Sequence, residues 1–123
     1  MKVVPSEHEE QAALFEWAEM ARCKHPCLKL LYAIPNGGKR DKITAARLKS
    51  EGVKKGVPDT CLPVPKGEYH GLYIELKRLK DSKTSPEQKQ WQKDLTEQGY
   101  KAIICKGWQS AAKEIMNYLK EVE

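Results

Sequence analysis

The sequence predicts an α/β domain in which a four-stranded mixed sheet is flanked by helices, in the order α-β-α-β-β-α-β-α. Segments with apolar residues at helical spacing alternate with short apolar runs that are typical of strands. Clusters of Gly and Pro separate these segments. The chain has 123 residues with 40% hydrophobic content, which suits one domain over residues 1–123 with a core of its own.

The first half of the chain is expected to hold two helices and one strand. The first helix should run from Ser6 to about Arg22, because Ser6 and Glu9 match a capping box. Its apolar face would consist of Leu14, Trp17, Ala18 and Ala21. Residues 28–34, LKLLYAI, are expected to form the first strand, and the stretch Lys39–Glu51 the second helix.

The second half of the chain is expected to supply three strands and two helices. Prolines in residues 56–64 predict a short or irregular strand, and residues 72–78 should form a hairpin with it. A helix is expected from its cap at Ser85 to Gly99, followed by a strand at 100–105. The chain would close with a helix whose inward residues are Trp108, Ala111, Ala112, Ile115 and Leu119.

Positive charge is concentrated in one segment. The net charge is +5, and residues 39–55 hold seven basic residues against two acidic ones, so this segment carries the whole excess. A local basic patch is typical of proteins that bind a phosphate backbone, whereas the alternative is a solvated, Lys-rich helix face. The residues expected to contact DNA are Lys39, Arg40, Arg47, Lys54 and Lys55.

Several other classes of function find no support in the sequence. No apolar run is long enough for a membrane span and the N-terminus lacks a signal peptide's apolar core, so we expect no membrane partner and a cytoplasmic protein. The four cysteines include no CxxC pair, which disfavours a zinc site. The stretch PNGGKR lacks the spacing of a P-loop. Trp17, Trp91 and Trp108 lie on apolar helical faces, which favours core packing over base stacking.

One set of charged residues points to chemistry. Alternation along the strand YIELKR places Tyr73, Glu75 and Lys77 on one face. If the two hairpin strands pair, Asp59 lies beside Glu75, and two converging carboxylates favour Mg²⁺ or Mn²⁺. Lys77 could then stabilise a phosphorane-like transition state, so the residues fit phosphodiester hydrolysis. The alternative is a solvated strand face, where such charges matter little.

A series of motifs in one order resembles a known nuclease family. These are SEHEEQ, IPNGGKR, GVKKGVPD, YIELKR, SPEQKQWQKDLTEQGY and KAIIC. Together they resemble the virus-type replication-repair nuclease (VRR-NUC) domain of the PD-(D/E)xK superfamily, in its stand-alone phage or bacterial form. The resemblance extends from Ser6 to about Leu119 and implies a restriction-endonuclease-like core.

The resemblance also implies roles for individual residues. Asp59 and Glu75 would bind the metal, Mg²⁺ or Mn²⁺, with the Leu76 carbonyl as a further ligand and Lys77 as the catalytic lysine. An acidic residue of the first helix would complete the metal site. Glu7 matches best for that role, and Glu10 is the alternative.

Two further elements of the site follow from the same resemblance. Gln88 would be a glutamine near the site, although its position in SPEQ fits equally well a capping-box partner of Ser85. Asn36, Gly37 and Gly38 would lie near the DNA.

The function that the resemblance implies is cleavage of branched DNA. The expected activity is a Mg²⁺- or Mn²⁺-dependent, structure-selective endonuclease, a Holliday-junction resolvase that acts as a homodimer in a bacterial or phage-infected cell. A flap or single-strand nuclease that acts as a monomer is one alternative. A non-catalytic DNA-binding module is the other, and the presence of Asp59, Glu75 and Lys77 counts against it.

Overall fold

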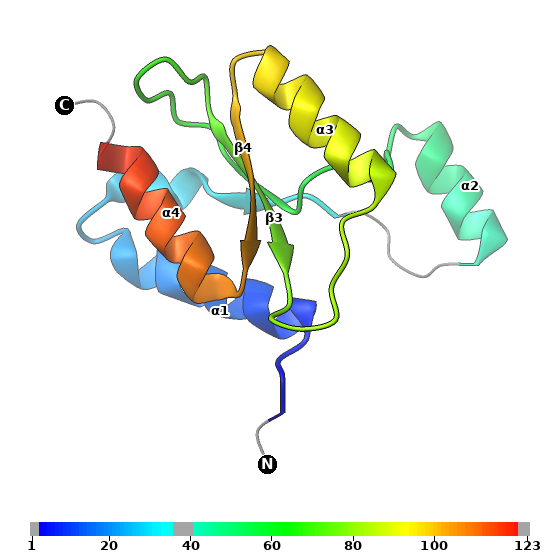
Figure 1. Ribbon diagram of the computed structural model, residues 1–123, viewed down its shortest axis with the longest axis horizontal. Coiled ribbons are helices and arrows are strands. Elements are labelled where there is room, and N and C mark those ends of the chain that lie inside the picture. The colour runs from blue at the N-terminus through cyan, green and yellow to red at the C-terminus, as the bar shows by residue number, and fades with distance from the viewer. Residues whose placement is uncertain (1–2, 36–40, 121–123) are drawn as a thin grey trace.

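The computed structural model describes residues 3–35 and 41–120 and has the predicted order of helices and strands (Figure 1). The elements are α1 (Glu7–Ala21), the 3-10 helix η1 (Pro26–Leu30), β1 (Tyr32–Ala33), α2 (Lys42–Ser50), β2 (Thr60–Leu62), β3 (Leu72–Lys77), α3 (Pro86–Glu97), β4 (Lys101–Lys106) and α4 (Trp108–Lys120). The predicted α/β fold class is therefore confirmed. No helix in the described ranges is long and apolar enough to cross a membrane.

The sheet is mixed and has the strand order β1-β2-β3-β4. β2 pairs antiparallel with both β1 and β3, which confirms the expected hairpin between β2 and β3. β3 and β4 run parallel, and α3 provides the crossover that a parallel pair needs. The hairpin fixes a register in which Thr60 lies opposite Ile74, and this register later decides where the acidic residues meet.

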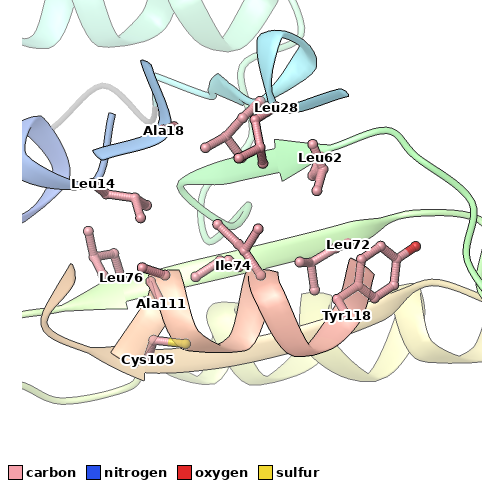
Figure 2. Close-up of a cluster of buried hydrophobic side chains, with 13 residues drawn as sticks. Leu14, Ala18, Leu28, Leu62, Leu72, Ile74, Leu76, Cys105, Ala111 and Tyr118 are labelled. Atoms are coloured by element: carbon pink, nitrogen blue, oxygen red, sulfur yellow. The ribbon is translucent and has the colours of Figure 1, made fainter. Parts of the chain in front are cut away.

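The core lies between the sheet and the helices α1 and α4. Ile74 and Leu76 of β3 point toward Leu14 of α1 and Ala111 of α4, and all four side chains are buried (Figure 2). Helix α3 lies against the opposite face of the sheet (Figure 1). In contrast, α2 stands apart from the body of the molecule and contains no buried residue.

The helix starts follow the signals in the sequence. Ser6 and Glu9 form the predicted capping box of α1, and Ser85 and Gln88 form another at the start of α3. Helix α2 begins later than expected, because the carboxylate of Asp41 accepts a hydrogen bond from the Thr44 N–H and acts as its N-cap.

The prediction of a strand over residues 28–34 is wrong for its first half. Pro26 opens a 3-10 helix instead, in which the Leu28 N–H bonds to the His25 carbonyl and the Leu31 N–H to that of Leu28. Leu28 and Leu31 are both buried, and their spacing of three equals one 3-10 turn. The run of apolar residues therefore reflects a short helix that packs on the core, and only Tyr32–Ala33 form a strand.

The expected packing in the core is found for two of the three tryptophans. Trp17 and Trp108 pack against the core cluster. Trp91 lies outside that cluster, because α3 covers the other face of the sheet and its described residues are at most partly buried. Tyr118, which the sequence pattern did not single out, is fully buried and donates a hydrogen bond to the Val64 carbonyl.

Candidate active site

The two acidic residues of the hairpin meet because of its register. Asp59 directly precedes β2, and continuing the pairing of Thr60 with Ile74 by one position places Asp59 beside Glu75. The Leu76 N–H donates a hydrogen bond of 2.7 Å to Asp59 Oδ2, which orients the carboxylate. The hairpin thus brings together two carboxylates that fifteen residues separate in the sequence.

Both carboxylates are in surroundings that disfavour their charge. Glu75 is only 2% exposed, and burial together with the nearby Asp59 charge raises its pKa from 4.5 to about 8. Burial also raises the pKa of Asp59, against the opposing effects of the Leu76 N–H and of Lys77. A buried and a partly buried acid side by side therefore need either a shared proton or a cation.

The free oxygen of Glu75 fits a divalent cation. Glu75 Oε1 is buried and receives no hydrogen bond from the described residues. Carboxylate and carbonyl oxygens are the ligands that Mg²⁺ and Mn²⁺ prefer. No group of three His, Cys, Asp or Glu side chains within residues 3–35 and 41–120 is placed to hold a metal, so the protein's carboxylate set here is the pair Asp59 and Glu75.

Lys77 is buried beside the carboxylate pair. The residue is 5% exposed, and Nζ donates to the Lys83 carbonyl at 2.7 Å and to Gln88 Oε1 at 2.8 Å. The ammonium also lies 3.7 Å from Glu75 Oε2. A buried cation that neutral acceptors fix in place is suited to stabilise negative charge that develops at a neighbouring phosphate.

Gln88 performs both of the roles that the sequence left open. Its Oε1 accepts the Ser85 N–H at 2.9 Å as the capping-box partner, and the same oxygen accepts the Lys77 ammonium. Its Nε2 donates to Glu75 Oε2 at 2.9 Å. One side chain therefore starts α3 and connects the acid to the lysine.

The two glutamates of α1 have different surroundings. Glu10 is 2% exposed, and its Oε1 accepts the Trp108 N–H at 3.0 Å, so it caps the start of α4. Glu7 is exposed in the first turn of α1, and its charge contributes to the raised pKa of Glu75. Glu10 thus has a structural partner in α4, whereas Glu7 affects Glu75 through its charge.

The expected DNA-binding residues are only partly visible. Arg47, Lys54 and Lys55 are all exposed, the first on α2 and the other two shortly before Asp59. The rest of the expected set, Asn36, Gly37, Gly38, Lys39 and Arg40, lies outside the described residues.

A tight contact holds the loop before Asp59 against α3. Gly56 has a φ of +90°, and a Cβ there would lie 2.7 Å from the Glu87 carbonyl carbon. Next to it, the Lys55 carbonyl accepts a hydrogen bond of 3.1 Å from Trp91 Nε1. The sequence signal was the glycine of GVKKGVPD, but a contact partner more than thirty positions away could not be read from it.

We expect Gly56→Ala to destabilise the fold and to weaken catalysis. The positive φ alone costs about 1–2 kcal/mol for a residue with a Cβ, and the overlap with α3 adds to it. Gly52→Ala is the matched control, because Gly52 has a φ of +97° but nothing within 4 Å of its added Cβ. Urea unfolding and cleavage rates should show a larger loss for Gly56→Ala. Equal effects of the two variants would contradict the proposed packing.

Comparison with known proteins identifies the family. The sequence model of the VRR-NUC domain matches residues 4–109. This chain belongs to the VRR-NUC family. A VRR-NUC domain of this kind is a PD-(D/E)xK-type nuclease, which acts on DNA and whose relatives generally use divalent metals.

One solved structure supports the assignment of the whole chain to the VRR-NUC fold. It is described as a VRR_NUC domain protein, is 31% identical, and superposes with a TM-score of 0.84 over 100% of this chain and 94% of that chain. No curated protein matches the sequence. The residues that we predict to form the PD and ExK motifs of this VRR-NUC domain, Pro58-Asp59 and Glu75-Leu76-Lys77, lie within the matched range.

Proposed function

We propose that the chain is a metal-dependent, structure-selective DNA endonuclease that resolves Holliday junctions as a homodimer. The observation that carries the proposal is the buried Glu75 with the partly buried Asp59 and the fixed ammonium of Lys77 beside it. A nuclease needs charge stabilisation where the scissile phosphate sits, and that need explains why a small domain places these three ionisable groups together away from full solvation.

The residues that would hold a Mg²⁺ or Mn²⁺ ion are Asp59 and Glu75, with the Leu76 carbonyl as a further ligand. Such an ion supplies positive charge for the phosphate and lowers the pKa of a nearby water. No donor among residues 3–35 and 41–120 hydrogen-bonds to Glu75 Oε1, which leaves that oxygen available to an ion.

Gln88 would position Lys77 and Glu75, and Lys77 would stabilise charge on the phosphate. Gln88 fixes the Lys77 ammonium through Oε1 and restrains Glu75 through Nε2, so neither group needs to reorganise when the substrate arrives. The ammonium would stabilise the negative charge that builds up on the phosphate oxygens.

A single carboxylate pair per chain accounts for the proposed homodimer. Resolution of a four-way junction requires two symmetric cuts, and the described part of the chain brings together one such pair. A two-fold dimer would present two sites in the required arrangement. The exposed Arg47, Lys54 and Lys55 would supply contacts to the phosphate backbone.

A cleavage assay over four substrates tests the proposal. With Mg²⁺ or Mn²⁺, a labelled four-way junction should be cut at least about tenfold faster than linear duplex, and EDTA should abolish cutting. Mass measurement in solution should give twice the chain mass of 14.0 kDa. Equal cutting of duplex would refute structure selectivity, and a monomer that prefers flaps or single strands would refute the resolvase proposal.

A further inference from the structure

A pocket of about 410 Å³ is lined by residues that follow β1, by the segment between α2 and Asp59, and by Trp91 of α3. Its walls are largely apolar, and the residues that matter here are Ile34, Pro35, Val53, Lys54, Val57 and Trp91. A pocket of this size accommodates a small organic group, and its combination of apolar walls and one large aromatic ring is typical of ligand sites.

The pocket is joined to the active site through two chain segments. The Ile34 N–H donates a hydrogen bond of 2.7 Å to the Asp59 carbonyl, and Val57 precedes Asp59 by two residues. On α3, Trp91 follows Gln88 by three residues and so lies on the same helix face. Two walls of the pocket are therefore connected directly to the segments that carry Asp59 and Gln88.

Trp91 is held in place for contact with a ligand. Its Nε1–H donates to the Lys55 carbonyl at 3.1 Å, which fixes the orientation of the ring. The ring is only partly buried and does not belong to the core cluster. A fixed, accessible indole provides a stacking surface at little entropic cost.

The charges around the pocket indicate what enters it. Lys54 lines the pocket, and both Lys54 and Lys55 are exposed where they can meet phosphates. Glu51 also lines it, and its carboxylate can accept a hydrogen bond from an N–H of a base. An aromatic ring, apolar walls, phosphate-binding cations and one acceptor together match a nucleotide with its base turned inward.

We propose that this pocket holds an unpaired nucleobase of the substrate strand next to the cleaved phosphate. The proposal rests on the proposed nuclease function and names the feature that the site would select. A base within an intact duplex is stacked and paired and cannot enter, whereas a base at a branch point or in a single strand enters at low cost. The pocket would thus favour branched and single-stranded DNA over duplex.

Binding without cleavage tests this proposal apart from the nuclease function. In EDTA, the full chain would be titrated with a short labelled oligothymidine and with an abasic oligonucleotide of the same length and charge, followed by fluorescence anisotropy. The wild-type protein should bind the base-bearing strand about 5- to 150-fold more tightly, which corresponds to the stacking of one base. Equal affinity for the two strands would overturn the proposal.

Substitutions in the pocket test whether it is the origin of the tighter binding of the base-bearing strand. Trp91→Ala should reduce the ratio of the two affinities to about one and leave the salt dependence of binding unchanged, because the phosphate contacts remain. Trp91→Phe keeps a ring and should retain most of the ratio. Val53→Phe fills the pocket but preserves Trp91 and its bond to Lys55, so it gives the same test if Trp91→Ala fails to fold.

A control variant and three further outcomes separate the pocket proposal from its alternatives. Ile43→Ser is the control, because Ile43 is an apolar side chain that is 84% exposed on α2 and lies outside the pocket. A ratio that survives both Trp91→Ala and Val53→Phe would overturn the proposal. The proposal would also be overturned if Trp91→Ala or Val53→Phe changed the mass of the protein in solution but left the ratio of the two affinities unchanged. The pocket would then receive part of a second copy of the chain. A preserved base preference in a protein that cuts no DNA would refute the nuclease function but not the pocket.

Discussion

Replacing Lys77 with methionine is expected to lower the rate of DNA cleavage about 100-fold or more. Methionine preserves most of the buried stem but removes the ammonium that lies 3.7 Å from Glu75 Oε2. DNA affinity should change little, because a residue that is 5% exposed adds little to phosphate binding. Single-turnover cleavage of a labelled junction and a binding titration in EDTA separate the two quantities.

Lys106→Met is the matched control for this experiment. Lys106 is the register partner of Lys77 on β4, but its side chain is exposed. It should therefore lose at most about twofold in rate. Normal cleavage by Lys77→Met, or an equal loss in both variants, would show that the buried ammonium has no special role. Circular dichroism must show that both variants are folded.

The second large effect is a fall in stability as the pH rises in the absence of metal. The pKa of Glu75 is about 8 in the folded protein and 4.5 for the ordinary group, so between these values the folded state holds a proton that the unfolded chain releases. The resulting stabilisation is complete below pH 4.5 and is lost as the pH rises through 8. The free energy of unfolding should fall by up to about 1.4 kcal/mol per pH unit in this window.

Urea unfolding in EDTA at several pH values measures this slope. Glu75→Gln keeps the size of the side chain and an acceptor for Gln88, but it cannot ionise, so it should remove most of the slope. Asp59, whose pKa is also raised, contributes in the same direction and leaves a smaller residual slope. Excess Mg²⁺ should stabilise the wild type most at high pH, where the carboxylates are ionised. If the free energy of unfolding of Glu75→Gln had the same pH dependence as that of the wild type, the dependence could not be assigned to the Glu75 carboxyl.

Residues that are close in sequence or that belong to one hairpin could be placed from the sequence. The spacing of Asp59, Glu75 and Lys77 needs only one antiparallel pairing to bring the first two together, and the structure has that pairing. The capping boxes of α1 and α3 are local motifs within four residues and were equally readable.

Other features depend on contacts that no local pattern encodes. Glu10 caps a helix that begins 98 residues later, so its burial could not be inferred from the acidic run around it. The apolar run at residues 28–34 has no unique period, which is why a 3-10 turn resembled a strand. Trp91 lies on an apolar helix face, but which face of the sheet that helix covers is a tertiary property.

The double use of Gln88 narrows which amino acids its position can accept. Glutamate would keep an acceptor for Ser85 and Lys77, but it would lose the N–H that Glu75 receives and would add a third negative charge. Asparagine would be one methylene too short to reach the same three partners. Lysine or methionine would fail both as a cap and as a bridge. A position that looks like an ordinary helix start therefore has the mutational tolerance of an active-site residue.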